Sequence, residues 1–563
     1  MPTPTDRPFP AWPADRAARY RAAGAWADTT IGAELAATAL RFPDRTAVVD
    51  ADRRLTYAEL DRAATAVALG LLGPGVVPGP GAVSGPGLVP GDVVVVQSGN
   101  VVETVVAFYG LVRAGLVPVC ALPQHGERDI ADLCTISGAR AHLVQADWAR
   151  SDLPAAAGRL RETHGTRVLT VRGRVPGGIA LEDLLDGAAP DGPALPRPDA
   201  EGLAVLQLSG GTTGTPKLIP RVHCDYVCNA RAWVDRWGWD EHVVSIHALP
   251  VAHNAGIALS VLPAMLAGGT LVLAPGADAA TVARMIEREG ATDMVANATV
   301  AYRLLESPEA DAGALRSLRR LSVGPQTPEY AARLESELGI RALGVFGMGE
   351  GLIMGTPWDA PYEVRLSTVG TPIHPLDEVR IVDVDTDDDL VDVAPGEVGE
   401  LICRGPYTIP GFYAAPEHDA RAFTEDGYYR TGDLARAHDV GGTTYYSIEG
   451  RIKDNVNRGG EKIHADEIER LLVTHPAVAE VAVVGMPDPE LGERLCAFVV
   501  PRTGAAPPTV PDLAEFLLGL GLAKFKLPER VEIRDALPVT TVRKVAKKAL
   551  REDIAAILTR ERG

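Results

Sequence analysis

The stretch DVVVVQSGNVVETVVAFYGLVRAGLVPVCAL, residues 92–122, decides the fold class. It begins with an apolar, β-branched run, continues with a longer stretch typical of a helix, and returns to a second apolar run. Between residues 291 and 347 the segments ATDMVANA, YAARLESELG and RALGVFG repeat this alternation. Alternating strands and helices are typical of parallel sheets covered by helices, so we expect an α/β fold.

The chain has 563 residues, which is too long for one compact core. After residue 450 the pattern changes to a turn-rich, charged segment followed by a helix and short strands. We therefore expect a large α/β domain with a small β subdomain over residues 1–452, and a small mobile α+β domain over residues 453–563. The Pro- and Gly-rich segment 73–92 is expected to be a flexible surface insertion without regular structure.

The overall composition excludes several classes of protein. Lys and Arg number 55 against 74 Asp and Glu, which gives a net charge of −19. Such an acidic balance argues against a surface that coats nucleic acid, because phosphate binding needs clustered cations. No apolar run approaches the roughly 20 residues that cross a bilayer, and the N-terminus does not resemble a secretory signal. We expect neither nucleic acid nor membrane as a partner.

The six cysteines form no CxxC pair. A disulfide framework is therefore not expected, the thiols should be reduced, and the cytoplasm is the default location. Cys224 and Cys228, with His223 beside them, could be metal ligands, but they lack a fourth partner. Packing within a helix is the better interpretation of these three residues.

The strongest local signal is LQLSGGTTGTPKLI, residues 206–219, in which an apolar strand runs into a loop of glycines and hydroxyls. Glycines let the backbone turn its N–H groups inward, hydroxyls add donors and a lysine adds positive charge, which together suit a polyphosphate. A hydroxyl-rich turn without a ligand is the alternative. The P-loop NTPase motif does not fit, because Pro216 precedes the lysine and Leu218 follows it. The candidate phosphate-binding residues are Ser209, Gly210, Gly211, Thr212, Thr213, Gly214 and Lys217.

SGGTTGTPK resembles the phosphate loop of the ANL superfamily, which contains acyl- and aryl-CoA synthetases, nonribosomal adenylation domains and luciferases. Further blocks match in the family's order: LPVAHNAG (249–256), ALGVFGMGEGL (342–352), YYRTGDLA (428–435), GRIKDNVNRGGEKI (450–463) and LPVTTVRKVAKKAL (537–550). The resemblance implies that a carboxylate attacks the α-phosphate of ATP, giving an acyl-adenylate and pyrophosphate, and that a thiol then takes the acyl group.

The same match assigns the nucleotide site. Phe346 would stack on adenine, with Gly324 and Gly347 beside the base, because a flat ring offers a stacking face. Glu350 would hold Mg²⁺, which prefers hard oxygen ligands. The ribose would be bound by Asp433, an acceptor for both hydroxyls, and by Arg451. The alternatives are a core Phe, a capping Glu and an ordinary turn Asp.

In the last two blocks the resemblance implies a hinge and a catalytic cation. Lys453 occupies the hinge position, and Lys544 would bridge the incoming carboxylate and the α-phosphate. The family usually has glycine before that lysine, where this chain has Arg543, so the loop is expected to have an altered backbone. Lys547 and Lys548 are expected to be solvated.

Outside these blocks the chain is most similar to the stand-alone aryl-acid ligases of siderophore and aryl-capped peptide pathways, which activate 2,3-dihydroxybenzoate or salicylate. By that match His253 lies near the carboxylate, and Asn254 contacts a hydroxyl or ring nitrogen ortho to it. Ala255 replaces a Tyr or Phe, and Leu259 replaces a Ser or Cys. Losing that hydroxyl argues against a catechol. The residues expected to line the acid site are His253, Asn254, Ala255, Leu259, Gly324, Gly349 and Leu352.

Small residues at 255 and 349 suggest a larger ring, of the hydroxyquinaldic or quinoxaline type, or a pyridine acid. After residue 550 only a short helix is expected, so the thiol donor should be the phosphopantetheine of a separate carrier protein, with CoA as the second choice. ATP and Mg²⁺ are the expected cofactors. An aliphatic acyl-CoA synthetase and a non-catalytic ligand-binding relative are the competing interpretations; the second is favoured only by Arg543.

Overall fold

The computed structural model describes residues 9–73, 76–77, 83–84, 86–185, 195–209, 217–324, 328–384, 390–458, 461–488, 491–520, 522, 524–540 and 544–562. The described chain forms two compact units. The N-terminal unit contains described residues up to 209 together with 217–378 and 403–429, and the C-terminal unit contains those in 379–402 and 430–562. The expected hinge boundary at 452/453 stays a prediction.

A seven-stranded sheet in the N-terminal unit contains the stretch that predicted the fold. Its order is β11-β10-β6-β5-β7-β8-β9, and every neighbouring pair is parallel except β10 and β11. The predicted strand–helix–strand unit is confirmed as β5, α4 (Val102–Arg113) and β6. The strands are β5 (Val93–Gln97), β6 (Val117–Ala121), β7 (Ala141–Gln145), β8 (Arg167–Val171), β9 (Ile179–Ala180), β10 (Leu203–Leu208) and β11 (Leu218–Val222).

A nine-stranded sheet has the order β18-β17-β16-β15-β14-β12-β13-β1-β2. It is parallel from β16 to β1, and its outer strands β2, β17 and β18 pair antiparallel. The strands are β1 (Thr46–Val49), β2 (Arg54–Thr56), β12 (Val244–His247), β13 (Thr270–Leu273), β14 (Asp293–Ala296), β15 (Arg320–Val323), β16 (Arg341–Met348), β17 (Gly351–Gly355) and β18 (Thr371–Pro372).

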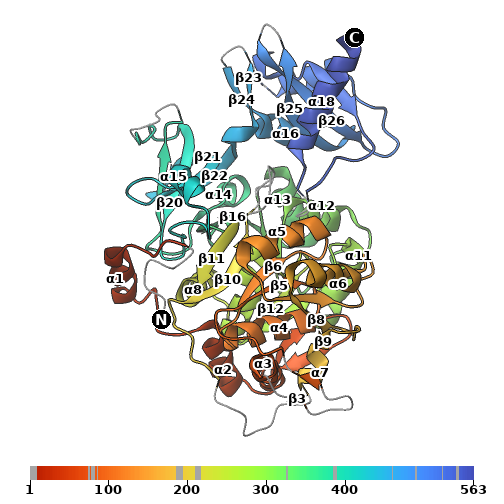
Figure 1. Ribbon diagram of the computed structural model, residues 1–563. Helices are drawn as coiled ribbons and strands as arrows, with labels where there is room; N and C mark the ends of the chain where they lie inside the picture. The colour runs from red at the N-terminus through yellow and green to blue at the C-terminus, as the bar shows by residue number, and fades with distance from the viewer. Residues whose placement is uncertain are drawn as a thin grey trace. The chain divides into compact units, whose positions relative to one another are not determined.

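Helices cover both faces of each sheet, as expected for parallel sheets (Figure 1). One apolar core joins both sheets to α2, α3, α4, α8 and α10, while α5 and α6 pack on the other face of the seven-stranded sheet and α11, α12 and α13 on that of the nine-stranded sheet. Helix α4 is buried along almost its whole length, which explains why it is apolar on all sides. The helices are α1 (Ala14–Ala22), α2 (Ile31–Arg41), α3 (Tyr57–Leu72), α5 (Glu127–Ser137), α6 (Leu153–His164), α7 (Leu181–Leu185), α8 (His223–Trp237), α10 (Leu262–Ala267), α11 (Ala279–Glu289), α12 (Ala298–Glu306), α13 (Pro328–Leu338), α14 (Tyr362–Ser367) and α15 (Pro416–Ala422).

The Pro- and Gly-rich segment 73–92 contains some regular structure, contrary to expectation. Strands β3 (Val76–Val77) and β4 (Val83–Ser84) pair antiparallel. Both are short runs that contain β-branched residues between Pro and Gly, which allows a minimal ladder despite the surrounding composition. Leu88, near the end of the segment, is buried.

The C-terminal unit carries a five-stranded sheet and a four-stranded sheet of order β19-β20-β21-β22; a small β subdomain was expected, but as part of the large domain. In the five-stranded sheet β26 pairs with β25, β23 and β27, α16 and α17 pack on one face, and α18 packs on the other. The elements are β19 (Glu378–Val382), β20 (Val398–Arg404), β21 (Tyr429–Val440), β22 (Thr443–Arg451), β23 (Asn455–Arg458), β24 (Glu461–His464), α16 (Ala465–Leu472), β25 (Val478–Asp488), β26 (Gly492–Pro501), α17 (Val510–Gly519), β27 (Arg530–Ile533) and α18 (Lys547–Arg562).

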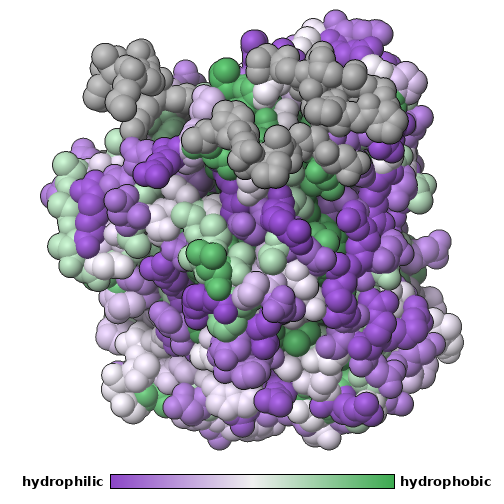
Figure 2. All heavy atoms as spheres, turned by 90° about the horizontal axis from the view of Figure 1, so that it is seen from below, coloured by the Kyte–Doolittle hydropathy of each residue, from purple (hydrophilic) through white to green (hydrophobic). Residues whose placement is uncertain are grey.

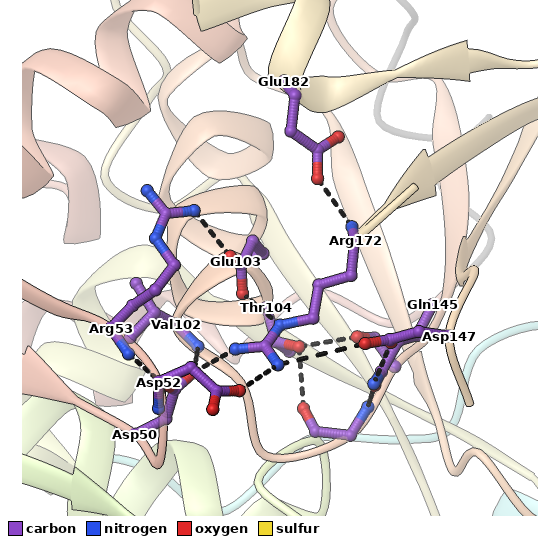
Figure 3. Close-up of polar contacts among 12 residues, drawn as sticks. Asp50, Asp52, Arg53, Val102, Glu103, Thr104, Gln145, Asp147, Arg172 and Glu182 are labelled. Atoms are coloured by element: carbon purple, nitrogen blue, oxygen red, sulfur yellow. Dashed lines mark hydrogen bonds and ion pairs between the residues drawn. The ribbon is translucent and has the colours of Figure 1, made fainter. Parts of the chain in front are cut away.

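An ionic cluster, buried except at Asp52, ties the two large sheets together (Figure 3). Arg172, just after β8, contacts Asp50 (Nη2–Oδ2, 2.7 Å), Asp52 (Nη1–Oδ2, 2.8 Å) and Glu103 (Nε–Oε2, 2.9 Å). Asp50, which follows β1, also accepts a hydrogen bond from the Val102 N–H at the start of α4. We call Arg172 and its three carboxylates the Arg172 cluster. It joins the end of a strand in one sheet to a helix and a strand of the other.

All six cysteines lie among the described residues, and all are buried free thiols. Cys224 and Cys228 pack within α8, and the buried His223 ring accepts a hydrogen bond from the Ile31 N–H through Nδ1. The described part of the chain contains no group of three His, Cys, Asp or Glu side chains that could hold a metal ion. By their burial, Cys224, Cys228 and His223 contribute to the packing of α8.

The described helices include none with the length and apolarity that a bilayer span requires. The face drawn in Figure 2 is mostly hydrophilic, with hydrophobic residues in small separate groups.

Candidate active site

The predicted phosphate loop leaves and re-enters the edge of the seven-stranded sheet. Strands β10 and β11 form an antiparallel pair, and the loop between them is closed at its base by Ser209 and Lys217. The Ser209 N–H donates to the Lys217 carbonyl (2.9 Å), and the Lys217 N–H donates to Ser209 Oγ (3.1 Å). The predicted residues Gly210, Gly211, Thr212, Thr213 and Gly214 lie outside the described residues.

Three of the predicted acid-binding residues, His253, Asn254 and Ala255, lie at the start of a short helix, α9 (Asn254–Gly256). His253 caps it, and its Nδ1 accepts a hydrogen bond from the Ala255 N–H (3.2 Å). Because Nδ1 acts as an acceptor, a neutral ring carries its proton on Nε2. The turn needs glycine at 256, where a Cβ atom would lie 2.2 Å from the Val251 carbonyl oxygen.

Helix α9 continues as a π-helix, Ile257–Val261, in which the Leu262 N–H bonds to the Ile257 carbonyl. Single π turns occur frequently at functional sites because they change the direction of side chains. Leu259 lies in this turn and is buried in the apolar core, with 6% of its surface exposed. The position at which Leu259 replaces a Ser or Cys is therefore apolar and lacks a side-chain hydrogen-bond partner.

Asn254 has a partner that the sequence reasoning missed. The Tyr226 hydroxyl donates to Asn254 Oδ1 at 2.6 Å. Tyr226, on the first turn of α8, is fully buried, and Asn254 is 9% exposed. The amide at the predicted ring-binding position is therefore held from the protein side by a phenol.

Asn100 is a second missed residue, and it supports the loop that leads to Asn254. Its Oδ1 accepts a hydrogen bond from the Val251 N–H (2.7 Å), and its Nδ2 donates to the carbonyls of Leu249 and Ala274 (both 2.8 Å). Asn100 lies just before α4 and is itself buried. One side chain thus joins the seven-stranded sheet to the acid-binding segment.

A fully buried arginine, Arg221 on β11, lies behind these residues. It pairs with Asp225 (Nε–Oδ1, 3.2 Å), stacks over the Tyr226 ring at 4.2 Å from the ring centre, and donates through Nη1 to the Gly349 carbonyl (3.1 Å). Its Nη2 has no hydrogen-bond partner among the described residues. We call Arg221, Asp225, Tyr226, Asn254 and Gly349 the Arg221 cluster.

Burial raises the pKa of Asp225 to about 6, although the charge of Arg221 lowers it. Burial likewise raises the pKa of Tyr226 well above its usual value. A phenol with a raised pKa keeps its proton at neutral pH, so Tyr226 is a hydrogen-bond donor there.

The predicted adenine and magnesium residues lie on β16 and the turn to β17. Phe346 and Gly347 are on β16, Glu350 is in the turn, and Leu352 is on β17. Phe346 and Glu350 are mostly buried, with 8% and 9% exposed. Gly351, with φ +156°, lies so close to Thr408 that a Cβ atom would be 2.6 Å from its Cα, which fixes the turn around Glu350.

Two glycines predicted to line the acid site, Gly349 and Gly324, differ in the space beside them. At Gly349 a Cβ atom would lie 2.6 Å from Ile219 Cδ1, so Ile219 already fills the space that the glycine leaves. The expectation of extra room at 349 is therefore wrong on this side. At Gly324, directly after β15, a Cβ atom would have no described neighbour within 4 Å. Among the described residues, open space is therefore found next to Gly324 and not next to Gly349.

The predicted ribose residues are a cross-strand pair in the C-terminal unit. Asp433 on β21 lies opposite Arg451 on β22, and Arg451 Nε contacts Asp433 Oδ1 at 2.8 Å. Asp433 is 4% exposed. Burial raises its pKa, while the charges of Arg451 and Lys544 lower it. Both cations therefore favour the ionised carboxylate that ribose binding requires.

Lys544 lies on an exposed loop of the same unit. The Thr540 N–H donates to the Lys544 carbonyl (2.7 Å), and the Lys544 N–H donates to Thr540 Oγ1 (3.2 Å). Lys453 lies in the short 3₁₀ helix Ile452–Asp454 that follows β22. Arg543 lies outside the described residues.

The expectation that Lys547 is solvated is wrong. Its Nζ pairs with Asp466 (Oδ1, 2.6 Å) and Glu469 (Oε1, 2.9 Å), and its side chain is only 13% exposed. Both carboxylates lie on α16, which packs in the same unit, so Lys547 at the start of α18 has a structural role. Lys548 is exposed as expected, with Glu552 3.9 Å away.

Comparison with known proteins identifies the family. Residues 35–413 match the AMP-binding enzyme family, and residues 467–544 match the AMP-binding enzyme C-terminal domain. The 2,3-dihydroxybenzoate-AMP ligase of Bacillus subtilis (strain 168) is 39% identical over 97% of this chain and 98% of the relative. The salicyl-AMP ligase / salicyl-S-ArCP synthetase of Mycobacterium tuberculosis is also 39% identical, over 96% of this chain and 94% of the relative.

Among solved structures, that of ATP-bound MatB from Rhodopseudomonas palustris superposes with a TM-score of 0.81 and is 28% identical, covering 94% of this chain and 100% of that chain. The expected fold class is thus confirmed. The two matches span the block that holds Phe346 and residues 537–544 of the last block, which include Lys544. This chain belongs to the AMP-binding enzyme family.

Proposed function

We propose that this protein is an aryl acid–AMP ligase. It uses ATP to convert an aromatic carboxylic acid into an aryl-adenylate, releases pyrophosphate, and passes the aryl group to the phosphopantetheine thiol of a separate carrier protein. The observation that carries the proposal is the buried amide of Asn254, which is held by Tyr226 and is followed in the chain by Ala255 and the apolar Leu259. One fixed polar group beside an apolar surface suits a flat ring with one polar substituent.

The names of the two relatives support both halves of this reaction. Each is an AMP ligase of a hydroxylated benzoate, and one is also named as a synthetase of an aryl thioester on a carrier protein. CoA is the alternative acceptor. A thiol of either kind would attack the activated carbonyl and release AMP.

In the first half-reaction two anions must meet, so catalysis depends on positioning and charge neutralisation. We assign Lys544 to the acid carboxylate and the α-phosphate, and Lys217 with the hydroxyl loop to the β- and γ-phosphates. Asp433 and Arg451 would hold the ribose, and Phe346 would stack on adenine. His253, with its proton on Nε2, would donate toward the carboxylate.

Glu350 is the side chain that would hold Mg²⁺. One buried carboxylate, with no wider group of acidic ligands among the residues that the structure describes, fits this ion, because Mg²⁺ is commonly held by one or two carboxylates together with substrate phosphates. When bound, the ion supplies positive charge to the phosphate oxygens. Glu350 itself is fixed by the neighbouring backbone, since the Ile409 N–H donates to its carbonyl at 2.8 Å.

For the acid itself we propose an aryl acid with an ortho hydroxyl or ring nitrogen, and a bicyclic ring such as 3-hydroxyquinaldic or quinoxaline acid as the larger alternative. Leu259 leaves a second phenol oxygen without a partner, which disfavours a catechol. The space beside Gly324 and the small Ala255 favour the larger ring.

The test is ATP–pyrophosphate exchange with a panel of benzoate, salicylate, 2,3-dihydroxybenzoate, picolinate, 3-hydroxyquinaldate, quinoxaline-2-carboxylate, acetate and decanoate. Exchange should be fastest with one of the ortho-substituted or bicyclic aryl acids. Preference for aliphatic acids would instead favour an acyl-CoA synthetase, and absence of exchange with every acid would favour a non-catalytic relative. Preference for 2,3-dihydroxybenzoate would exclude the bicyclic assignment alone.

A matched pair of lysine variants tests the assignment of the catalytic cation. Lys544→Ala should lower the exchange rate by about 100-fold or more, in the range found when one group that stabilises the transition state is removed. It should still transfer a preformed aryl-adenylate to a carrier thiol, because the small domain is proposed to rotate about Lys453 between the two steps. Lys548→Ala removes an exposed lysine four residues away and should leave both steps unchanged. Equal effects of the two variants would contradict the assignment.

A further inference from the structure

We infer that Tyr226 and Arg221 are positioning residues that fix the direction of the Asn254 amide, so that the acid must present a hydrogen-bond acceptor ortho to its carboxylate. This inference rests on the proposed function and narrows its substrate class. It concerns residues of β11 and α8, which lie outside the blocks that assigned the site.

The first step is the direction of the amide. Tyr226 donates to Asn254 Oδ1 at 2.6 Å, a short distance within the usual range for an O–H···O bond. If the amide were turned over, its NH₂ would face the phenol. The phenol proton would then lose the acceptor that it meets at 2.6 Å, in a site where Tyr226 is fully buried. Folded proteins rarely leave a buried hydroxyl unsatisfied, so the phenol selects the orientation with Oδ1 inward.

The second step is what the amide then offers to a ligand. With Oδ1 bound to Tyr226, the NH₂ group is the part of Asn254 that remains, and no hydrogen bond from Nδ2 to a described residue is found. An amide NH₂ is a donor only. A ring hydroxyl oxygen or ring nitrogen has a lone pair for it. An aromatic ortho amine offers N–H groups instead and would bring donor against donor.

The third step is what holds Tyr226 in place. The Arg221 guanidinium lies 4.2 Å from the centre of the Tyr226 ring, and Nη1 of the same group donates to the Gly349 carbonyl. A Cβ atom at Gly349 would be 3.9 Å from Asn254 Cβ, so both groups that Arg221 contacts lie next to Asn254. Arg221 is on β11, the strand that leaves Lys217 at the base of the phosphate loop. Strand β11 therefore connects the predicted ring-binding residues with the base of the phosphate loop.

The experiment compares acids that differ only in the ortho group. Salicylate and anthranilate form one pair, and 3-hydroxy-2-naphthoate and 3-amino-2-naphthoate form a bicyclic pair. In pyrophosphate exchange the wild-type protein should prefer the hydroxy acid of the better pair by about 10- to 100-fold in kcat/KM, the range expected when a buried donor is left without its partner. Equal use of the amino acid would overturn the inference.

Tyr226→Phe keeps the ring under Arg221 and removes only the hydroxyl. The amide can then turn to accept from an amine, so the preference for hydroxy over amino acid should fall about tenfold. In an Asn254→Ala background the same change should alter the preference less than twofold, because Tyr226 acts through Asn254. An unchanged preference in Tyr226→Phe, or an equal change in both backgrounds, would contradict the proposed role.

Tyr57→Phe is the matched control. Tyr57 is also a fully buried tyrosine, and its hydroxyl donates to the carbonyls of Gly269 (2.7 Å) and Ala264 (3.1 Å) rather than to Asn254. It should leave the preference unchanged, so any general effect of losing a buried hydroxyl is separated from the loss of amide orientation. If exchange occurs with aliphatic acids alone, the proposed function fails. If aryl acids exchange without an ortho preference, only this inference fails.

Discussion

Two largely buried arginines of the N-terminal unit, Arg172 and Arg221, have opposite surroundings. In the Arg172 cluster the guanidinium meets three carboxylates, and each of its nitrogens has a partner (Figure 3). In the Arg221 cluster the guanidinium is more deeply buried but meets one carboxylate, and Nη2 has no described partner. The first arginine joins elements of two sheets. The second touches a tyrosine and a carbonyl that border the predicted acid site.

The difference shows how a buried charge can be used. A fully paired network gives a rigid joint, whereas an incompletely paired one carries a cost in stability. Such a cost is expected where function requires it. The balance of partners therefore separates a structural arginine from one that supports a site, although both are buried and ion-paired.

Breaking the Arg172 cluster should have the largest effect on stability. Arg172→Met leaves the buried Asp50 without its cation and leaves Glu103 with Arg53 as its remaining cation, and we expect a loss of ~3 kcal/mol in the free energy of unfolding. Exchange activity per folded molecule and acid preference should stay the same. Urea unfolding and pyrophosphate exchange measure the two quantities. Arg174→Met is the control, because Arg174 forms an exposed pair with Asp183 that should contribute less than ~1 kcal/mol.

Breaking the Arg221 cluster should have a smaller effect on stability and a larger effect on activity. Arg221→Met leaves one carboxylate, and Asp225 can take up a proton because its pKa is already raised. The loss of stability should therefore be smaller, ~1–3 kcal/mol, close to that of an unsatisfied polar group. The kcat/KM for the best aryl acid should fall about tenfold or more, since Tyr226 and Gly349 lose their common support. A stability loss equal to that of Arg172→Met, with unchanged kinetics, would remove the distinction between the clusters.

Asn100 connects the two regions and should show a mixed effect. It lies two residues before Val102, which bonds to Asp50, and its side chain holds Val251, three residues before Asn254. Asn100→Ala should lower the free energy of unfolding by ~1–2 kcal/mol and raise KM for the acid severalfold. Asn100→Asp keeps the acceptor for the Val251 N–H and loses the donors to two carbonyls. It therefore tests which of these hydrogen bonds sets the free energy of unfolding and the KM for the acid. Unfolding curves and exchange kinetics at varied acid concentration report both effects.

The smallest effect is a change in pH dependence at Asp225. Burial raises its pKa to about 6 despite Arg221, so the folded protein binds this proton more tightly than the unfolded chain does. The stability gained from that proton is complete below about pH 4 and is lost as the pH rises through 6. Asp225→Asn cannot titrate and should lack this loss. The difference in unfolding free energy between variant and wild type should therefore shift in favour of the variant from pH 4 to pH 7; a constant difference would contradict the assignment.

Those parts of the fold that depend on local pattern could be predicted from the sequence. The unit β5–α4–β6 followed from the lengths and apolarity of its segments, and the change after residue 450 coincides with the start of the five-stranded sheet. The pair β3 and β4 was missed, because composition alone does not show that two Val-containing dipeptides will meet. Patterns predict elements better than they predict which short runs find each other.

Only those site residues that lie within sequence motifs could be predicted. Asn254 and His253 came from one block, but Tyr226 lies 28 residues from Asn254 and Arg221 lies 128 residues from Gly349. No spacing rule links residues at such separations, since the packing of α8 and β16 decides their contact. The prediction that Lys547 is solvated was wrong for the same reason, because its partner Asp466 is 81 residues away. A polar residue at the start of a buried helix, such as Tyr226 on α8, is the signal that could have been followed.

The π turn Ile257–Val261 has an evolutionary consequence. Such a turn holds one residue more than an α-helix needs over the same rise, so the loss of a single codon could restore regular winding without disturbing either flank. The side chains after Asn254 would then be redistributed around the axis, and a different one would take the position of Leu259. A lineage could thus remodel the wall of its ring site by changing the length of the segment, with no point substitution at all.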